Sequence, residues 1–155
     1  MIKICFVCLG NICRSPMAEF IFQFMVENEN LQDKIFACSK GTSAEELGNP
    51  IHPGAAKELQ KHDIPFSKRQ ATQLEKEDYQ QFDYFIGMDY SNIFHIKRIF
   101  GKDPDHKVFK LMDFTNSKDD IADPWYTRDF SSTYDDLIEG CHAFLEFLKK
   151  EYSLS

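Results

Sequence analysis

A thiol, a guanidinium and a hydroxyl lie close together near the start of the chain, in the segment VCLGNICRSP (7–16). Cys8 can supply a thiolate, which is a strong nucleophile and ionises readily beside cations and helix N-termini. Arg14 offers a planar fork of donors that matches two oxygens of a phosphoryl group. Ser15 can donate a hydrogen bond to the thiolate. These residue types at this spacing predict an attack of sulfur on a bound phosphoryl group.

The residues between the thiol and the guanidinium are predicted to form an anion-binding loop; they are Leu9, Gly10, Asn11, Ile12 and Cys13. Backbone amides that point inward at a helix N-terminus attract anions. Gly10 allows close approach of the backbone, and Asn11 tolerates left-handed geometry while its amide braces the loop. Such a loop would hold the transferring phosphoryl group against Cys8 and stabilise its charge in the transition state.

Attack by Cys8 would form a phosphocysteine and divide one displacement into two easier steps. The leaving oxygen then needs an acid, and Asp123, fixed in an extended conformation by Pro124, is the candidate. Two plainer interpretations stay open on spacing alone. Cys8 and Cys13 could be core thiols with Arg14 in a surface ion pair, and an Asp-Pro pair is a common turn.

The elements that position these residues follow an alternating pattern. Strands are predicted at 2–8, 34–39, 83–88 and 107–112, and helices at 16–30, 55–62, about 75–80, 90–101 and 131–152. Ser15 is the predicted N-cap of the first helix, with Pro16 at its first position. The pattern predicts an α/β fold of three αβα layers: a four-stranded parallel, doubly wound, flavodoxin- or Rossmann-like sheet with helices on both faces. Residues 1–155 are expected to form a single domain.

In a sheet of this kind, ligands bind outside the carboxyl ends of the strands. The segments 8–14, 39–48, 88–89 and 112–123 each follow a predicted strand. They are therefore expected to meet at one edge, with the cysteine loop in the pocket.

The amino-acid composition limits which binding partners and which cellular compartment are expected for this chain. The formal net charge of -7 argues against nucleic acid or an anionic membrane as partner, and no apolar run is long enough to span a bilayer. Five cysteines, an odd number, in a chain without a signal peptide indicate free thiols and a cytoplasmic location. Their spacing offers no zinc site. No metal and no cofactor are expected.

The segment VCLGNICRSPMAE resembles the signature of low-molecular-weight protein tyrosine phosphatases. The likeness extends along nearly the whole chain, through Ser39-x-Gly41-Thr42-Ser43, Gly48-Asn49-Pro50, Phe82-Asp83-Tyr84, Met88-Asp89-x-Ser91-Asn92, Asp123-Pro124-Trp125-Tyr126 and Ala143-Phe144-Leu145. It implies Cys8 as nucleophile, Arg14 as phosphate clamp, Ser15 as thiolate stabiliser and Asp123 as general acid and base. It also implies that Asn11 and Ser39 brace the loop by hydrogen bonds.

The resemblance implies phosphotyrosine-containing proteins or peptides as substrates, and inorganic phosphate or other oxyanions as ligands of the loop. The chain departs from the family pattern at Arg69 and Thr72, where relatives carry a His-x-Ala-Arg-Gln stretch. This departure alters the outer part of the bracing network, and the catalytic rate depends on how the network adapts.

The predicted substrate cleft comprises Ile12, Glu45, Trp125 and Tyr126, with the two aromatic rings as stacking surface for a phenyl group. An acidic rim is expected to disfavour strongly acidic phosphopeptides. Related protein-arginine phosphatases typically carry Thr at the position of Ile12, so an apolar side chain there favours phosphotyrosine. A protein-arginine phosphatase and a catalytically weak phosphate-binding module remain the alternatives. Arsenate reduction, which would need further cysteines near the third strand, is disfavoured, because no cysteine lies between Cys38 and Cys141.

Cys13 has two interpretations, a small loop filler and a redox partner. In the second, oxidised Cys8 is captured as a Cys8–Cys13 disulfide, which protects it from irreversible oxidation.

Overall fold

The computed structural model describes residues 1–154 and contains one parallel sheet of four strands in the order β2-β1-β3-β4. The strands are β1 (Ile2–Cys8), β2 (Ile35–Gly41), β3 (Tyr84–Gly87) and β4 (Val108–Lys110). β1 is the long central strand, and its run of β-branched and aromatic residues suits a position buried on both faces. The predicted bounds of β1 are confirmed, and the other three strands differ from prediction at their ends.

Two of these differences have clear physical causes. β2 continues past the predicted residue 39 to Gly41, which pairs with Cys8 and approaches Leu9 so closely that a Cβ atom would lie 2.8 Å from the Leu9 carbonyl oxygen. β4 is shorter than predicted because the Asp113 carboxylate accepts a hydrogen bond from the Lys110 amide at 3.0 Å and turns the chain into a short helix.

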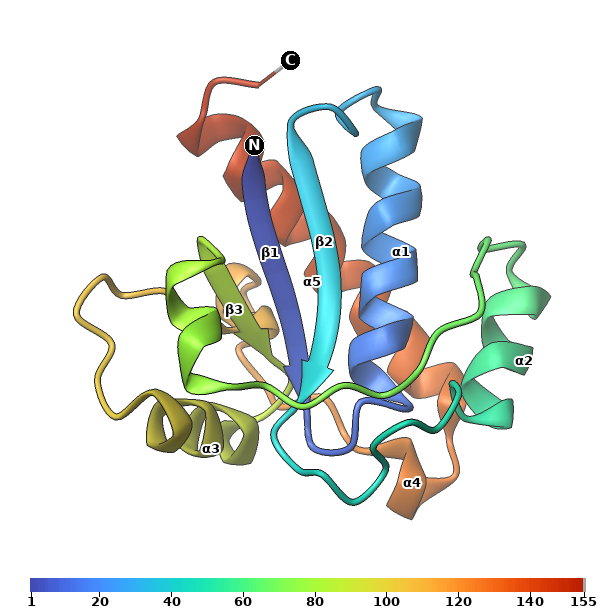
Figure 1. Cartoon of the computed structure of the whole chain (residues 1–155). Coiled ribbons are helices and arrows are strands. Elements are labelled where there is room, and N and C mark those ends of the chain that lie inside the picture. The colour runs from blue at the N-terminus through green and yellow to red at the C-terminus, as the bar shows by residue number, and fades with distance from the viewer. Residues whose placement is uncertain (155) are drawn as a thin grey trace.

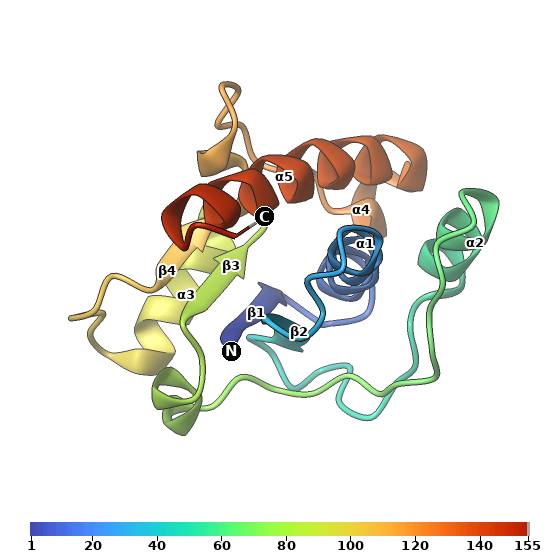
Figure 2. The same ribbon diagram turned by 90° about the horizontal axis from the view of Figure 1, so that it is seen from above.

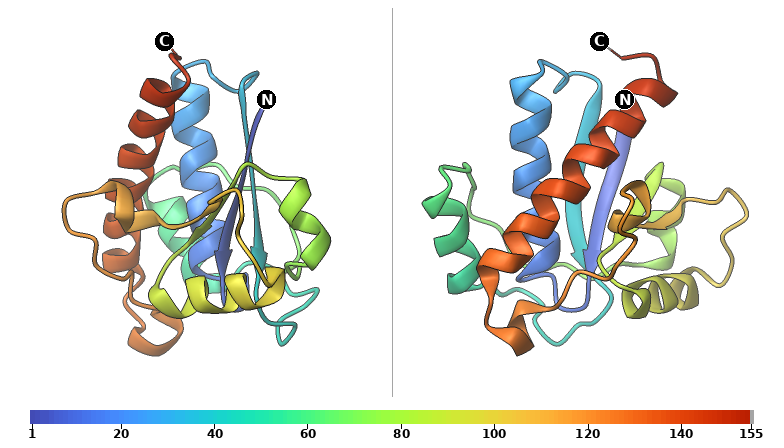
Figure 3. Two further views of the ribbon diagram at one scale, coloured as in Figure 1. Left: turned by 90° about the vertical axis from the view of Figure 1, so that its left-hand side faces the viewer. Right: turned by 180° about the vertical axis from the view of Figure 1, so that it is seen from behind.

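The helices lie on both faces of the sheet (Figure 2). Their bounds are α1 (Arg14–Asn28), α2 (Pro53–Lys61), η1 (Lys76–Gln80), α3 (Tyr90–Phe100), η2 (Leu111–Phe114), α4 (Pro124–Thr127) and α5 (Phe130–Glu151). Figure 3 shows α1 and α5 together on one side of the strands and η1 on the other. The predicted three-layer αβα architecture is confirmed.

The larger core lies between the sheet and the pair α1 and α5. Phe6 of β1 packs edge-on against Phe22 of α1 and Phe144 of α5, at ring-centroid distances of 5.4 and 6.4 Å. Burial of each such side chain stabilises the fold by about 1.5–3 kcal/mol. One face of α5 is apolar and buried in this core: Leu137, Cys141, Phe144, Leu145 and Leu148. These contacts hold α1, and with it the cysteine loop, against the sheet.

The carboxyl ends of the strands meet at one edge of the sheet, at the lower end of the view in Figure 1, where α4 also lies. Helix α1 follows β1 and α3 follows β3, and the two helices cover opposite faces of the sheet, so a crevice opens between the carboxyl ends of β1 and β3. This is the edge at which the sequence places the candidate site. Within residues 1–154, no helix combines the length and the apolar character needed to cross a membrane.

Candidate active site

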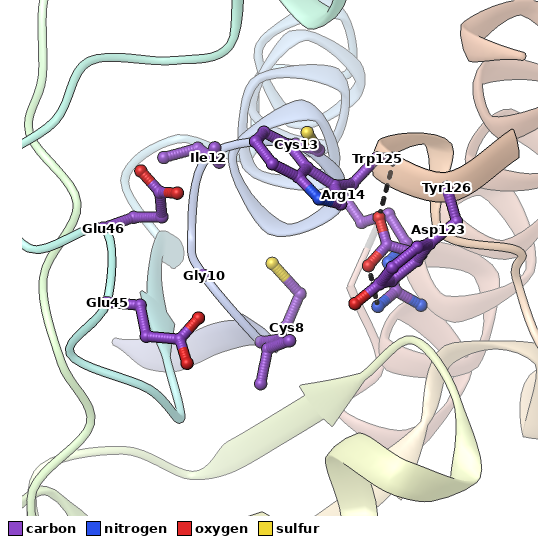
Figure 4. Close-up of a pocket in the computed structure, with 11 residues that line it drawn as sticks. Cys8, Gly10, Ile12, Cys13, Arg14, Glu45, Glu46, Asp123, Trp125 and Tyr126 are labelled. Atoms are coloured by element: carbon purple, nitrogen blue, oxygen red, sulfur yellow. Dashed lines mark hydrogen bonds and ion pairs between the residues drawn. The ribbon is translucent and has the colours of Figure 1, made fainter. Parts of the chain in front are cut away.

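One cleft at this edge collects most of the residues that the sequence singles out (Figure 4). It is lined by Cys8, Leu9, Gly10, Ile12, Cys13, Arg14, Glu45, Glu46, Asp123, Trp125 and Tyr126. The segments 8–14, 45–46 and 123–126 are far apart in the chain and converge here, as the strand pattern predicts. Asn11, Ser15 and Ser39 do not line the cleft. They lie beneath the loop and are buried there.

The sulfur of Cys8 is held from below by Ser15. The distance between Cys8 Sγ and Ser15 Oγ is 2.9 Å, and the Ser15 amide donates to the same sulfur at 3.4 Å. Asn11 Nδ2 donates to Ser15 Oγ at 2.8 Å, so the Ser15 hydroxyl proton is free to point at the sulfur. A sulfur that receives two donors is stabilised as a thiolate.

The predicted capping role of Ser15 is wrong. Helix α1 begins at Arg14, and its N-cap is Cys13, whose carbonyl accepts the Met17 amide at 3.1 Å. Ser15 therefore lies inside the first turn, and its hydroxyl contacts Cys8 and Asn11 where a capping serine would bond a backbone amide of the helix.

Asn11 organises the loop from its buried side. Its backbone is left-handed, with φ of 60°, as the sequence predicts. Besides Ser15, its Nδ2 donates to Ser39 Oγ at 3.0 Å. Its Oδ1 accepts from Arg69 Nη2 at 2.5 Å and from the Thr72 amide at 3.0 Å. All hydrogen-bonding positions of the Asn11 side-chain amide are thus occupied. Arg69 and Thr72, the two positions at which the chain departs from the family pattern, complete this network.

Glu19 extends this network and was missed at the level of sequence. Its Oε1 accepts from Ser39 Oγ at 2.6 Å. Burial raises the pKa of Glu19, against the opposing effects of the Ser39 hydrogen bond and the Arg69 charge. Burial also lowers the pKa of Arg69, which Glu19 and Cys8 oppose. A carboxylate in the middle of a helix, one turn after Ser15, carries no local signal that points to this position.

Arg14 is almost fully buried at 2% exposure and is fixed by three acceptors. Its Nη1 donates to Asp89 Oδ2 at 2.7 Å and to the Ile121 carbonyl at 2.8 Å, while Nη2 lies 3.4 Å from Asp123 Oδ2. Burial lowers the pKa of Arg14, but Cys8 and Asp89 outweigh it and the pKa is raised. The guanidinium is therefore a fixed cation at the base of the cleft.

Asp89 has a second function that the sequence did not indicate. It caps the following helix, since its Oδ1 accepts the Asn92 amide at 2.7 Å. The other oxygen of the same carboxylate holds Arg14. Its place directly after β3, on the edge where the site was expected, is the one feature that could have identified it.

Asp123 is the N-cap of the short helix α4. Its backbone is extended, as the following proline requires, and its Oδ1 accepts the Trp125 amide at 3.0 Å. The other oxygen faces Arg14 across the cleft (Figure 4). The carboxyl group thus has one oxygen fixed by the helix and one that faces Arg14 in the cleft.

The walls of the cleft differ in character. Glu45 and Glu46 lie on one side of Cys8, and Trp125 and Tyr126 lie on the other (Figure 4). The aromatic side chains are 43% and 74% exposed, so their faces are available to a planar ligand. Glu46 was not among the predicted site residues, and it lines the cleft beside Glu45.

Cys13 lies on the same loop and is 4% exposed. Burial, followed by the neighbouring Cys8, raises its pKa to about 12. It is therefore a protonated thiol at neutral pH. Residues 1–154 contain no group of three or more His, Cys, Asp or Glu side chains arranged to hold a metal ion.

Comparison with known proteins agrees with this geometry. The family model described as "Low molecular weight phosphotyrosine protein phosphatase" matches residues 3–154. The low molecular weight protein-tyrosine-phosphatase PtpA of Staphylococcus aureus is 41% identical, over 99% of this chain and 98% of that protein. Among solved structures, YfkJ from Bacillus subtilis is 38% identical with a TM-score of 0.94, covering 97% of this chain and 96% of that one. SP-PTP, a low molecular weight protein tyrosine phosphatase from Streptococcus pyogenes, is 40% identical with a TM-score of 0.85, covering 98% and 97%. The chain belongs to the low molecular weight phosphotyrosine protein phosphatase family.

Proposed function

We propose that this protein tyrosine phosphatase hydrolyses phosphotyrosine monoesters through a phosphocysteine formed on Cys8. The observation that carries the proposal is the convergence of three groups on one cleft: the Cys8 sulfur, the buried Arg14 fork and the Asp123 carboxyl group. Phosphoryl transfer needs a nucleophile, a clamp for the phosphoryl oxygens and an acid for the leaving oxygen.

In the first step, the Cys8 thiolate attacks phosphorus as the bond from phosphorus to the tyrosine oxygen breaks. Asp123 gives its proton to that oxygen, so tyrosine leaves as a neutral phenol. In the second step, Asp123 takes a proton from water, the water oxygen attacks the phosphocysteine, and phosphate leaves as the thiolate is restored. The Ser15 hydroxyl, directed by Asn11, stabilises the sulfur anion before and after transfer.

Arg14 is suited to stabilise the charge that develops on the phosphoryl oxygens. Its Nη1 is committed to Asp89 and the Ile121 carbonyl, which fix the plane of the guanidinium. Its Nη2 makes only a long contact of 3.4 Å with Asp123, so that donor is available to a phosphoryl oxygen. Because the cation is positioned before substrate arrives, little reorganisation is needed in the transition state. The same donors and the amides of residues 9–13 would hold inorganic phosphate or another oxyanion.

The walls of the cleft favour an aromatic phosphate ester. Trp125 and Tyr126 offer exposed ring surface, and Ile12 adds an apolar side chain to the lining. The apolar Ile12 side chain and the exposed ring faces suit a phenyl ring, which supports phosphotyrosine as the substrate. All five cysteines are free thiols, which supports the cytoplasm as the site of action.

The test is the rate of phosphate release from a phosphotyrosine peptide and a phosphoarginine peptide of the same sequence, with Cys8→Ser as the blank. Fast, Cys8-dependent release from phosphotyrosine is expected. Faster release from phosphoarginine would show that the proposed substrate is wrong and would leave the proposed mechanism unchanged. Release from neither peptide would indicate that the protein is a phosphate-binding module and not a phosphatase of either substrate.

A further inference from the structure

A second hollow lies beside the catalytic cleft, between α2 and the segment that joins α4 to α5. We call it the basic groove, because its lining includes Lys57 and Lys61 of α2 and Arg128, which follows α4. Lys57 and Lys61 are one helical turn apart, so they lie on the same face of α2. In Figure 1, α2 and α4 are neighbours at the end of the molecule that holds the active site.

The basic groove and the catalytic cleft share a wall. Trp125 lines the cleft, and the guanidinium carbon of Arg128 lies 5.8 Å from the centre of the Trp125 ring. His52 meets the same ring edge-on at 5.8 Å and stacks on Phe130, part of the groove lining, at 5.2 Å. A peptide chain that leaves the cleft over Trp125 therefore passes directly into the groove.

The cations of the basic groove are free to meet a ligand, and they outnumber its exposed carboxylates. Within residues 1–154, neither lysine nor Arg128 forms an ion pair, and all three side chains are exposed. Glu58 is buried and accepts from His62 at 2.8 Å and from Ser131 at 3.4 Å. Asp129 caps α5 and accepts twice from Ser132, at 3.0 and 2.6 Å, and these neutral donors leave its charge in place. The groove therefore presents three exposed cations and one exposed carboxylate.

The opposite rim of the cleft has the opposite sign. Glu45 and Glu46 lie across Cys8 from Trp125 (Figure 4). Glu46 accepts from the Asn49 amide group at 2.6 Å, a neutral donor that leaves its charge in place. A substrate chain that crosses the cleft thus meets cations on one side of the phosphotyrosine and carboxylates on the other.

We propose that the preferred substrates are phosphotyrosine proteins with acidic residues on one side of the phosphotyrosine only. The acidic flank docks in the basic groove, and the other flank, which faces Glu45 and Glu46, is neutral or basic. This inference rests on the proposed function and adds a rule of substrate polarity. It also limits the expected rejection of acidic phosphopeptides to those that carry their acidic residues on the wrong flank.

Three phosphotyrosine peptides test the rule: one with neutral flanks, one with three aspartates before the phosphotyrosine and one with three aspartates after it. At low ionic strength, one acidic peptide is expected to have a higher kcat/KM than the neutral peptide, and the other acidic peptide a lower one. Two exposed ion pairs change a binding constant by about 2- to 30-fold in total. The difference should appear in KM and should shrink as salt is added.

The variant Lys57→Glu/Lys61→Glu should reverse the preference for the favoured acidic peptide, and Lys57→Gln/Lys61→Gln should remove it. The matched control is Lys34→Glu/Lys150→Glu, which changes the net charge equally at exposed positions near the start of β2 and the end of α5, far from the cleft. The control should keep the wild-type preference.

A small substrate, para-nitrophenyl phosphate, separates this inference from the proposed function. All variants should hydrolyse it at the wild-type rate, because it does not reach the groove. If the wild type fails to hydrolyse it, the proposed function is wrong. If it is hydrolysed normally while the two acidic peptides are equal, or while the preference survives in Lys57→Glu/Lys61→Glu, the polarity rule is wrong.

Discussion

Replacement of Arg69 by methionine tests how far the catalytic loop depends on the network beneath it. Arg69 Nη2 donates to Asn11 Oδ1 at 2.5 Å, and Asn11 in turn positions Ser15 beneath the Cys8 sulfur. Arg69→Met removes this donor and keeps a flexible apolar side chain of similar reach. Asn11 then keeps only the Thr72 amide, at 3.0 Å, as donor to that oxygen.

The expected loss of stability follows from the type of bond removed. A hydrogen bond from a charged donor contributes about 1.5–3 kcal/mol, and Asn11 is fully buried, so water cannot replace the donor. We expect Arg69→Met to lower the free energy of unfolding by about 2 kcal/mol. Loss of alignment at Ser15 should lower kcat for a small aryl phosphate about 10-fold, which corresponds to about 1.4 kcal/mol in the barrier.

The loss of stability should depend on pH through Glu19. Burial raises the pKa of Glu19 above its ordinary value of 4.5, and the charge of Arg69 opposes that rise. Between its unfolded-state pKa and its higher folded-state pKa, such a carboxyl group binds more protons in the folded state than in the unfolded state. The free energy of unfolding therefore falls as pH rises through this interval. Without Arg69 the pKa rises further and the interval extends upward. The difference in stability between wild type and variant should therefore grow as pH rises from the raised pKa of Glu19 in the wild type to its still higher pKa in the variant.

Urea unfolding at several pH values, together with kcat on para-nitrophenyl phosphate, measures both effects. Lys68→Met is the matched control, since Lys68 is the exposed neighbour of Arg69 and should change neither quantity. Arg69→Lys keeps the charge near Glu19 without the planar fork, so it should restore the pH dependence more than kcat. If Arg69→Met matched wild type in both kcat and unfolding free energy, the network would not support the loop.

Four further substitutions test individual parts of the structure. Cys8→Ser should abolish hydrolysis while calorimetry still detects phosphate binding; loss of binding as well would show that the sulfur shapes the loop. Asp123→Ala should slow phenyl phosphate by about 100-fold or more and an ester with an activated leaving group far less, because only the poor leaving group needs a proton. Equal losses on both esters would remove Asp123 from the acid role. After peroxide treatment, dithiothreitol should restore activity in the wild type but not in Cys13→Ser, because condensation of the Cys13 thiol with the oxidised Cys8 sulfur, releasing water, would protect that sulfur from further oxidation; equal recovery would remove this role. Gly41→Ala should lower the urea midpoint, because a Cβ atom would lie 2.8 Å from the Leu9 carbonyl oxygen and cost about 1–3 kcal/mol; an unchanged midpoint would contradict that contact.

Local signals in the sequence were sufficient to predict the order of strands and helices that forms the scaffold. The apolar run Ile2–Cys8 and the glycine after it define β1 and its end, and the order of strands and helices predicts the sheet edge at which the site forms. The residues that line the cleft follow from this arrangement, because parallel strands deliver their following loops to one edge. The roles of these residues and the single-domain organisation of 1–155 stay predictions.

The residue roles that could not be predicted from the sequence depend on contacts between residues far apart in the chain. Ser15 looks like a helix cap by local preference, but the closed loop brings its hydroxyl to the Cys8 sulfur and overrides that preference. Asp89 also looks like a cap, and its second oxygen meets Arg14 across 75 positions of the chain. Glu19 shows no local signal at all. Such partners emerge only when segments distant in sequence pack together.

The order of the strands has a consequence for the protein as it leaves the ribosome. The nucleophile loop is made first, but Asp89 and Asp123, which surround Arg14, are made much later. Helix α1 also packs against α5, the last helix of the chain, and β1 needs β3 as its second neighbour. A nascent chain that stops before Asp89 therefore lacks both carboxylates that contact Arg14, and one that stops before α5 lacks the helix that packs against α1. Catalysis should begin only once synthesis is nearly complete, so truncated chains are expected to be inert toward phosphoproteins in the cell.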